Sequence, residues 1–217
     1  MKWFNKIMKG LAISIACIIL LYIIYFRFFF MHWGARVSET KKAYTGDSIV
    51  EIPDYANTIA ITIKKPPRDI WPWVAQMGVN KAGFYSYTWL ENIFGCNLHN
   101  ADKIHAEWQN PAVGDYEPVC EQAEKNKMPG WRISTIIPNK AFIYRSSVDS
   151  SWTMGFYIDS INENRSRLVT RMRYTSSGKF WDRFIDKIWL EWAHCIMQKG
   201  SINGIKKRAE KKNLSAD

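Results

Sequence analysis

Cysteine is scarce in this chain of 217 residues, and none of its four cysteines stands in a C-x-x-C pair. This spacing excludes the paired-cysteine motifs of zinc and redox sites. Cys17 lies in an apolar run, which leaves Cys96, Cys120 and Cys195 as an odd number in the rest of the chain. The sequence therefore supports no particular pairing, and a disulfide between Cys96 and Cys120 stays open.

Signatures of nucleophilic catalysis and of metal binding are also missing. No G-x-S-x-G motif occurs, and the four histidines have no serine or cysteine partner at an informative spacing. Cys96, His99, Asp102, His105 and Glu107 do fall close together. Their C-x2-H-x5-H spacing matches no closed zinc pattern, and a solvated loop accounts for the same residues. We predict no metal and no cofactor, and we assign no catalytic residue.

The folded body lacks an excess of positive charge, although the formal net charge of the chain is +10. Residues 1–42 hold seven Lys or Arg against one acid, and residues 199–212 hold six against one. The remainder carries 17 basic and 18 acidic residues. A nucleic-acid-binding domain places its basic residues on the folded surface, whereas basic ends beside an apolar segment fit anionic lipid headgroups. We expect no nucleic-acid partner.

Charge is absent from residues 10–26, and the apolar run extends to residue 31 if Arg27 turns toward the headgroups. At about 1.5 Å per residue, roughly 22 residues cover the ~30 Å hydrocarbon layer. This pattern predicts a membrane helix that contacts the lipid bilayer through residues 10–31. Aromatic rings stand at both ends of the run, as in an interfacial belt, at Trp3, Phe4 and Trp33.

A cleaved signal peptide is the alternative, because Lys2, Lys6 and Lys9 form a basic region before the apolar run. No good small-x-small cleavage site follows before Glu39, and the run is long for a signal peptide. We therefore favour an uncleaved, single-pass N-terminal anchor and a membrane localisation. Basic residues are nearly matched on the two flanks, so neither side of the membrane is favoured for the rest of the chain.

The first part of the remaining chain predicts a linker, a strand and two short helices. Residues 34–56 resemble a polar linker with a turn at 45–47, and isoleucines alternate over residues 59–63 as in a half-buried strand. Asp69 is placed to cap a helix that Gly78 ends, with Pro72 in its first turn. A second short helix is predicted from Ser86 to Phe94, capped by the serine.

The second part predicts an antiparallel meander followed by a long helix. Strand-like runs cover 131–137, 141–147, 151–161 and 167–175, with turn residues between them, and residues 115–120 add a strand before the first. A helical pattern begins near Lys179 and carries one apolar stripe. The stripe comprises Trp181, Phe184, Ile185, Ile188, Trp189, Trp192 and Ile196.

This order of elements describes an α+β helix-grip fold, in which a curved antiparallel sheet surrounds a long C-terminal helix. The segments "IWPWVAQMG", "AGFYSYTWLEN", "IHAEWQNPAVGD", "RLVTRMR" and "GIKKRAE" resemble the SRPBCC superfamily of START-related and polyketide-cyclase-like proteins, over roughly residues 55–211. Two features depart from this resemblance: Phe84 stands where a tryptophan is expected before "YSY", and residues 121–128 form an insertion-like run. The predicted organisation is an anchor over 1–33, a linker over 34–56 and a helix-grip domain over 57–212.

The resemblance implies a cavity between sheet and helix, and the residue pattern suggests what lines it. Residues 152, 154, 156 and 158 form one apolar strand face. Two cations on one strand usually mark an exposed face, so Arg171 either lies there or enters the cavity to meet a polar ligand group. Most of the other aromatic residues at helical spacing are expected in the core. The candidate ligand-binding residues are Trp71, Gln76, Tyr85, Trp89, Trp152, Phe156 and Arg171.

Three functions are compatible with this reasoning. The favoured one is a membrane-anchored domain that binds a small apolar or amphipathic ligand, including a lipid. The second is an enzyme similar to the cyclases and hydratases of the superfamily, with Gln76, Tyr85 or Arg171 polarising a carbonyl. The third is a protein-interaction or assembly module that holds no ligand.

Overall fold

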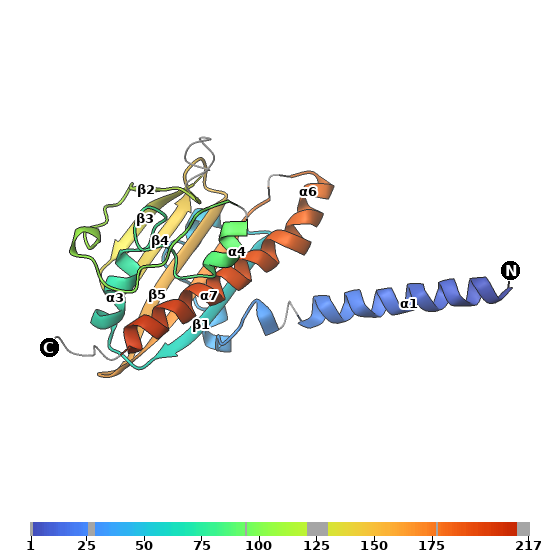
Figure 1. Cartoon of the computed structure of the whole chain (residues 1–217), viewed down its shortest axis with the longest axis horizontal. Coiled ribbons are helices and arrows are strands. Elements are labelled where there is room, and N and C mark those ends of the chain that lie inside the picture. The colour runs from blue at the N-terminus through green and yellow to red at the C-terminus, as the bar shows by residue number, and fades with distance from the viewer. Residues whose placement is uncertain (1, 26–28, 94, 121–129, 177, 212–217) are drawn as a thin grey trace.

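The computed structural model describes residues 2–25, 29–93, 95–120, 130–176 and 178–211. They form an antiparallel sheet, a long C-terminal helix across it and a separate N-terminal helix (Figure 1). The predicted α+β helix-grip arrangement is confirmed. The insertion-like run 121–128, Phe94 and residue 212 lie outside the described residues.

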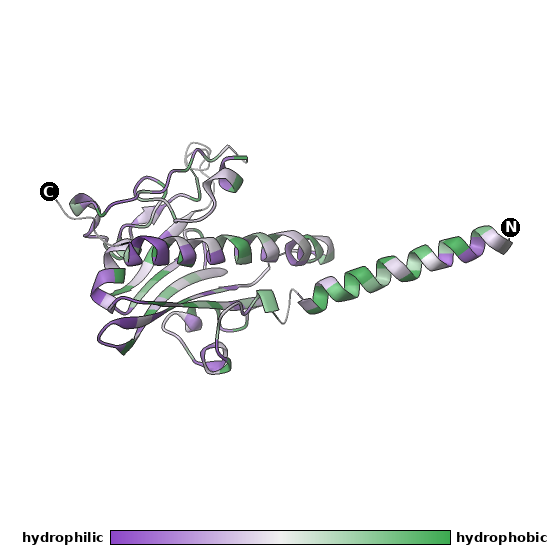
Figure 2. Ribbon diagram, turned by 60° about the horizontal axis from the view of Figure 1, so that its bottom comes forward, coloured by the Kyte–Doolittle hydropathy of each residue, from purple (hydrophilic) through white to green (hydrophobic). Residues whose placement is uncertain are grey.

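Helix α1 (Lys2–Tyr25) extends away from the rest of the chain, and its apolar residues are exposed along its length (Figures 1 and 2). The segment Trp3–Tyr25 is long and apolar enough to cross a membrane, a test that a signal sequence also passes. The prediction that this helix continues to Met31 is wrong. Met31 is only 4% exposed, and its carbonyl accepts a hydrogen bond from the Thr58 amide at 3.2 Å. It belongs to the domain because it packs into the core.

The sheet has six strands in the order β1-β6-β5-β4-β3-β2, and all neighbours are antiparallel. The predicted meander is confirmed by β3 (Trp131–Ile137), β4 (Ala141–Ser146), β5 (Trp152–Asn162) and β6 (Arg165–Tyr174). The strand expected over 115–120 is reduced to β2 (Tyr116–Glu117). The first strand, β1 (Tyr55–Ile63), pairs with the last, with Ile59 opposite Thr170.

Two short helices follow β1. Helix α3 (Pro67–Ala75) buries Ile70, Trp73 and Val74, the face that the sequence predicts. The helix begins at Pro67, so Asp69 lies in its first turn and is not the cap. Helix α4 (Thr88–Ile93) begins two residues after Ser86, whose hydroxyl donates to the Met197 carbonyl at 3.1 Å. Ser86 therefore makes a contact with the C-terminal helix in place of the predicted cap.

The C-terminal helix consists of α6 (Phe180–Ile185), a π-helical turn η4 (Asp186–Leu190) and α7 (Glu191–Glu210). The side of α7 that faces the sheet carries Cys195, Gln198, Ile202 and Ile205. The predicted apolar stripe points elsewhere, since Trp181, Phe184, Trp189 and Trp192 are exposed. Such a stripe usually faces the core, but here the buried side of the helix is partly polar and bonds to the sheet.

The two faces of the sheet have different coverings. Trp152, Met154, Phe156 and Ile158 of β5 face the main core beneath α7, as their alternation predicts. Tyr157 faces the other way, into a smaller cluster of buried side chains. Figure 2 shows α7 across one face and loop segments against the other. We call these the inner and the outer face.

The outer face is covered by the segment that the sequence describes as a polar linker. Helix α2 (Val37–Lys41) and the 3-10 turn η2 (Asp47–Val50) lie within it. The Tyr44 ring packs against Tyr157 at 4.4 Å between centroids, and Glu39 is buried against Arg167. Residues 34–50 therefore pack as part of the folded domain and are not an extended tether.

Candidate ligand cavity

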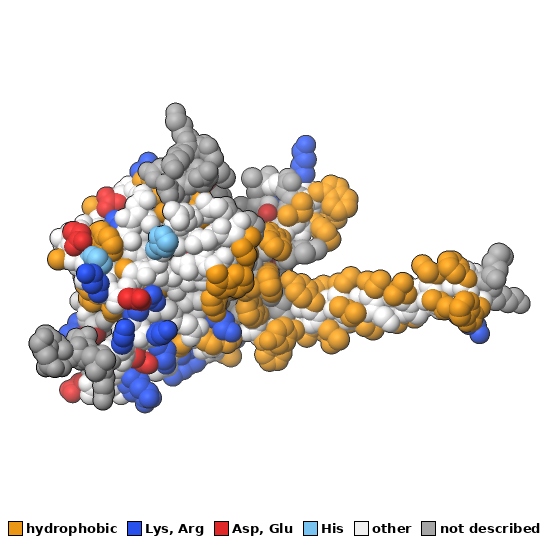
Figure 3. All heavy atoms as spheres, viewed as in Figure 1, with side chains coloured by type: hydrophobic (Ala, Val, Ile, Leu, Met, Phe, Trp, Pro, Cys, Tyr) orange, Lys and Arg blue, Asp and Glu red, His pale blue; other side chains and the backbone are white. Residues whose placement is uncertain are grey.

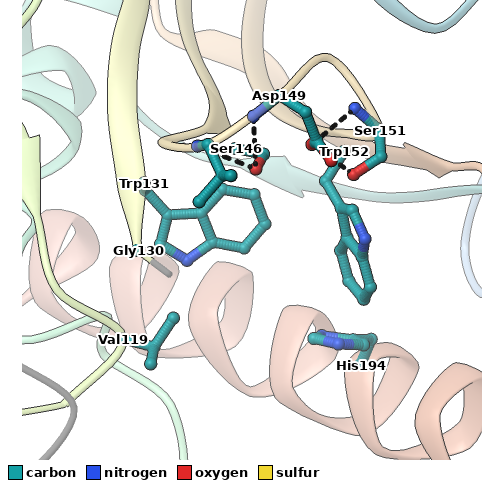
Figure 4. Close-up of a pocket in the computed structure, with 9 residues that line it drawn as sticks. Val119, Gly130, Trp131, Ser146, Asp149, Ser151, Trp152 and His194 are labelled. Carbon is teal, nitrogen blue, oxygen red and sulfur yellow. Dashed lines mark hydrogen bonds between the residues drawn. The ribbon is translucent and has the colours of Figure 1, made fainter. Parts of the chain in front are cut away.

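A cavity of two adjacent lobes lies between the inner face of the sheet and the first turns of α7. Figure 4 shows the residues that line the larger lobe. The outer lobe has a volume of about 370 Å³ and the inner lobe about 180 Å³. Val119, Trp131 and His194 line both lobes, so they form the wall between them. Small-molecule sites usually occupy about 300–1,000 Å³, so the outer lobe by itself suits a ligand of modest size.

Aromatic rings form the wall of the outer lobe. The Trp152 ring stacks on Tyr174 at 4.4 Å and meets Trp131 edge to face at 6.2 Å. From α7, His194 approaches the Trp152 ring edge to face at 5.1 Å (Figure 4). The turn from Ser146 to Ser151 forms the rim, where Asp149 accepts hydrogen bonds from the amide and hydroxyl of Ser151. These contacts hold a rigid, largely apolar opening.

The inner lobe is apolar apart from a few polar groups, of which Glu91 of α4 is the most informative. Its walls include Met154, Met172 and Leu98. The Glu91 Oε2 atom is buried and has no hydrogen-bond partner among the described residues. Burial raises the pKa of this carboxyl to about 7, because an apolar environment disfavours the charged form. Near neutral pH Glu91 is therefore partly protonated and can donate a hydrogen bond.

His194 has the opposite electrostatic response to the same cavity. Burial lowers its pKa to about 4, so the imidazole is neutral at neutral pH. A neutral imidazole offers one N–H donor and one acceptor. The inner lobe thus presents a neutral imidazole and a partly protonated carboxyl to a ligand.

A buried polar network at the base of the inner lobe fixes α7 to the sheet. Asn57 of β1 donates from Nδ2 to Gln198 Oε1 and to Cys195 Sγ, the latter at 3.2 Å, and its Oδ1 accepts from the Met172 amide at 3.1 Å. The Tyr55 hydroxyl lies 2.9 Å from Cys195 Sγ. Gln198 lines the inner lobe and also donates to the Thr170 hydroxyl. The floor of the cavity is therefore preorganised.

Cys96 and Cys120 are free thiols that lie next to each other, with Cys96 at the edge of the inner lobe. Burial, followed by the hydrogen bond to Cys120, raises the pKa of the Cys96 thiol to about 12. The thiolate is the nucleophilic form of cysteine, so this value argues against nucleophilic chemistry at Cys96.

Of the seven candidate residues, Trp152 lines the outer lobe, and the other six are not among the residues that line either lobe. Phe156 is buried in the core, and Trp71 packs toward Phe142 at 6.1 Å between ring centroids. Trp89 of α4 is 65% exposed and is not part of the cavity walls. Three of the aromatic candidates thus lie on elements around the cavity without reaching it.

Arg171 lies on the outer face of the sheet, so the expectation that it enters the cavity is wrong. Its Nε donates to Asp47 at 2.9 Å and its Nη1 donates to the Thr58 hydroxyl at 2.8 Å. The physical reason is strand alternation, because Met172 takes the inner position next to it. The side chain is nevertheless largely buried, since residues 34–50 cover this face.

Gln76 and Tyr85 form a structural junction instead of a cavity mouth. Gln76 Nε2 donates to the Tyr85 hydroxyl at 2.8 Å, while its Oε1 accepts from the His105 amide at 3.1 Å. The Arg208 guanidinium lies 4.9 Å from the Tyr85 ring centroid. The motifs that contain residues 76, 85 and 208 therefore meet at one corner, where their polar atoms satisfy one another.

The close approach of α7 to Tyr85 requires a glycine at position 204, the first residue of "GIKKRAE". A Cβ built on Gly204 would clash with the Tyr85 carbonyl oxygen. Gly204→Ala should therefore lower the unfolding free energy by about 1–3 kcal/mol, although alanine favours an isolated helix by about 1 kcal/mol. Chemical denaturation of the full chain in detergent tests this, with exposed Lys207→Ala on the same helix as the neutral control. A gain in stability for Gly204→Ala contradicts the packing.

Sequence reasoning missed Glu91, His194 and Trp131 as cavity residues. Trp131 begins a predicted strand, but a register shift between Ile133 and Thr135 obscures which face it takes. A lone carboxyl in the apolar run "TWLENIF" is the one signal that points to Glu91. Nothing in the local sequence distinguishes His194.

The residues from Cys96 to His105 form a loop, as the sequence predicts, and the 3-10 turn η3 (Ala106–Trp108) follows it. His105 stacks on Trp108 at 4.1 Å and its Nδ1 lies 3.1 Å from Glu107 Oε1. The described residues hold no group of three or more histidine, cysteine, aspartate or glutamate side chains arranged to bind a metal.

Comparison with known proteins finds likeness in structure only. No family model and no curated protein matches the chain. A hypothetical protein of Helicobacter pylori superposes with a TM-score of 0.50 at 7% identity, covering 81% of this chain and 100% of that one. A polyketide-cyclase-like protein of Corynebacterium glutamicum gives a TM-score of 0.34 at 16% identity, covering 74% and 97%. The Aha1 dimer of Colwellia psychrerythraea gives 0.40 at 12% identity, covering 70% and 98%.

The chain has a helix-grip arrangement, in which a long C-terminal helix crosses an antiparallel sheet, and the likeness to the Helicobacter pylori protein is a likeness of fold alone. In this helix-grip domain the cavity lies between the curved sheet and its helix at the α6 end of α7. At the other end the space is filled, because Ile63, Ile70, Leu168 and Ile205 pack together in the core.

Proposed function

We propose that this chain is a membrane-anchored binding domain that holds a small apolar or amphipathic ligand, such as a lipid, between the sheet and α7. The observation that carries the proposal is the two-lobed cavity with its walls of Trp131, Trp152, Met154 and Met172. Apolar walls with a few placed polar groups are typical of small-molecule sites. Burial of apolar ligand surface there supplies the binding free energy.

The polar groups indicate which end of the ligand lies deepest. Glu91, His194 and Gln198 contact the inner lobe and offer uncharged donors and acceptors near neutral pH. A hydroxyl, ketone or ester oxygen satisfies the Glu91 carboxyl, whereas a carboxylate ligand meets a second acid. We therefore expect a neutral, oxygen-bearing end in the inner lobe and the apolar remainder in the outer lobe.

Helix α1 supplies the anchor in this proposal. It is exposed and apolar over the length that a bilayer requires. Only five residues separate Tyr25 from Met31, which is already packed in the domain. The domain is therefore held against the membrane surface, within reach of lipids.

An enzyme is the second candidate, and the Glu91 and His194 pair is the observation that favours it. Two titratable groups whose pKa values are pushed to about 7 and about 4 line one lobe, a pattern found where acid–base chemistry occurs. A cyclase or hydratase would use Glu91 to protonate or polarise a ligand oxygen. Turnover that is lost in Glu91→Gln while binding persists distinguishes this candidate from simple binding.

Mass spectrometry of the molecules that co-purify with the detergent-extracted full chain tests the binding function. We expect a discrete apolar compound in the wild type, and its loss in Trp152→Ala, which removes the outer-lobe wall. Trp89→Ala is the matched control, since this tryptophan is exposed and outside the cavity.

Trp152→Ala also removes the stack on Tyr174, so a loss of ligand in this variant could come from misfolding. A second variant separates the two causes. Met197→Trp fills the inner lobe and leaves that stack in place. A wild type that carries nothing, and that binds no added long-chain alcohol, contradicts the proposal and favours an interaction module.

A further inference from the structure

An exposed aromatic ridge runs along α6 and η4 to the start of α7. Its rings contact one another, with centroids 5.4 Å apart for Phe180 and Trp181 and 5.9 Å apart for Trp181 and Phe184. Folded domains rarely leave so many large apolar side chains together in water without an interaction partner. The ridge consists of Phe180, Trp181, Phe184, Ile185, Trp189 and Trp192, whose exposed fractions range from 40% to 73%.

The ridge lies at the end of the domain from which α1 leaves (Figure 1). Figure 3 shows hydrophobic side chains gathered at that end and along α1. The exit of α1 lies near the helix that bears the ridge. Tyr22 of α1 lies within electrostatic reach of Glu191 at the start of α7, and Lys199 Nζ lies 4.6 Å from the Trp33 ring centroid.

We propose that this aromatic ridge inserts into the headgroup region of the same bilayer that α1 crosses, as a second and interfacial membrane contact. The inference rests on the proposed anchor. Tryptophan favours the membrane interface, and interfacial helices bury their apolar face about 5–10 Å into the headgroup and acyl boundary. Residues 180–192 hold two basic and three acidic residues, so the aromatic rings, and not an excess of positive charge, favour this membrane contact.

The ridge also places the cavity beside the bilayer. A hollow of about 250 Å³ lies between them, lined by Trp152 and Tyr174 on one side and by Asp186 and Leu190 of η4 on the other. It shares Ser151 and Trp152 with the outer lobe. An inserted ridge therefore holds the opening of the cavity at headgroup level, where a lipid enters without crossing water.

A fluorescence experiment on the full chain in vesicles tests this insertion. A polarity-sensitive dye is attached at Phe184→Cys, in a chain whose Cys17 and Cys96 are replaced by serine, and the vesicles contain phosphatidylcholine, phosphatidylglycerol and a headgroup-nitroxide lipid. The matched control carries the dye at Asn164→Cys, in the exposed β5–β6 turn at the opposite end of the domain. We expect several-fold stronger quenching at 184 than at 164, and a blue-shifted emission at 184.

The outcomes separate the ridge from the anchor. Resistance of the protein to alkaline carbonate extraction reports whether α1 is inserted. Extraction resistance with equal, weak quenching at both positions overturns the ridge proposal and leaves the anchor standing, whereas extraction into the soluble fraction overturns the anchor itself. Cross-linking of 184 to 184 between chains, without quenching, shows that a second copy covers the ridge and also overturns the proposal.

Discussion

Replacing Arg167 with alanine is expected to lower the unfolding free energy by about 3–5 kcal/mol, because it leaves a buried carboxylate without its partner. Arg167 and Glu39 are each only 8% exposed. The Arg167 Nε donates to Glu39 Oε1 at 2.6 Å and Nη2 donates to Glu39 Oε2 at 2.9 Å. This bidentate pair joins α2 to β6 and so fixes residues 34–42 on the outer face.

The pair also explains why a segment with a linker's composition folds. Burial by itself raises the pKa of Glu39, but hydrogen bonds from Arg167 and from the Arg36 amide outweigh it and hold the pKa below its usual value. The contribution of ionised Glu39 to the unfolding free energy is therefore fully present at pH values above the usual pKa of a glutamate. It is lost as the pH falls through the lowered pKa.

Urea denaturation of the detergent-solubilised full chain measures the effect. Lys42→Ala is the control, because the Lys42 and Asp159 side chains are 49% and 51% exposed, and such surface pairs contribute about 0–1 kcal/mol. The double variant Glu39→Met with Arg167→Met should recover much of the loss, since an apolar pair removes the unpartnered charge. Equal losses for Arg167→Ala and Lys42→Ala would show that the pair does not hold the segment.

Glu91→Gln is expected to stabilise the domain above pH 7 and to have little effect near pH 4.5. The pKa of Glu91 is raised from 4.5 to about 7, so the native state holds this proton more tightly than the unfolded chain does. Stability therefore falls as the pH rises from about 4.5 to about 7, and levels off above it. Discounted for partial exposure, the difference should reach about 1–2 kcal/mol.

The comparison must be made between wild type and variant at each pH. The pKa of His194 is lowered from 6.5 to about 4, so its contribution to stability decreases as the pH drops between those values. This dependence on pH is opposite to that of Glu91. The effect of His194 is common to both proteins and cancels in their difference. Unfolding free energies measured from pH 5 to pH 9 provide the test, and a difference that stays constant over this range contradicts a buried, protonated Glu91.

The same titration predicts the pH dependence of ligand binding. If protonated Glu91 donates to a ligand oxygen, affinity for a long-chain alcohol falls by about tenfold per pH unit above pH 7 in the wild type. Glutamine retains a donor and does not ionise, so Glu91→Gln binds equally across this range.

Local sequence patterns were sufficient for most of the elements. Alternation in 152–158 predicts both strand β5 and its apolar inner face, and the turn residues separate β3, β4, β5 and β6 near their observed bounds. Helical spacing predicts the buried face of α3. These patterns suffice because strand and helix periodicity are properties of neighbouring residues.

Long-range contacts account for the features that local sequence patterns did not predict. The pattern of β6 is typical of an exposed position at Arg171. The side chain is nevertheless covered by residues 34–50, more than a hundred positions away in the chain. The apolar stripe near residue 185 predicts a core face, yet the core side of α7 is the partly polar one, because Asn57 and Tyr55 bond to it. Neither partner is visible in the local pattern.

Composition and short-range periodicity were enough to predict the strands, the long C-terminal helix and the apolar N-terminal helix, and short motifs carry the resemblance to a helix-grip superfamily. The packing of distant segments was needed to show that β1 closes the sheet beside β6, that residues 34–50 cover the outer face, and that Glu91, His194 and Trp131 meet at one cavity. A cavity wall is assembled from segments far apart in the chain, and its polar groups acquire their pKa values from burial that no single segment specifies.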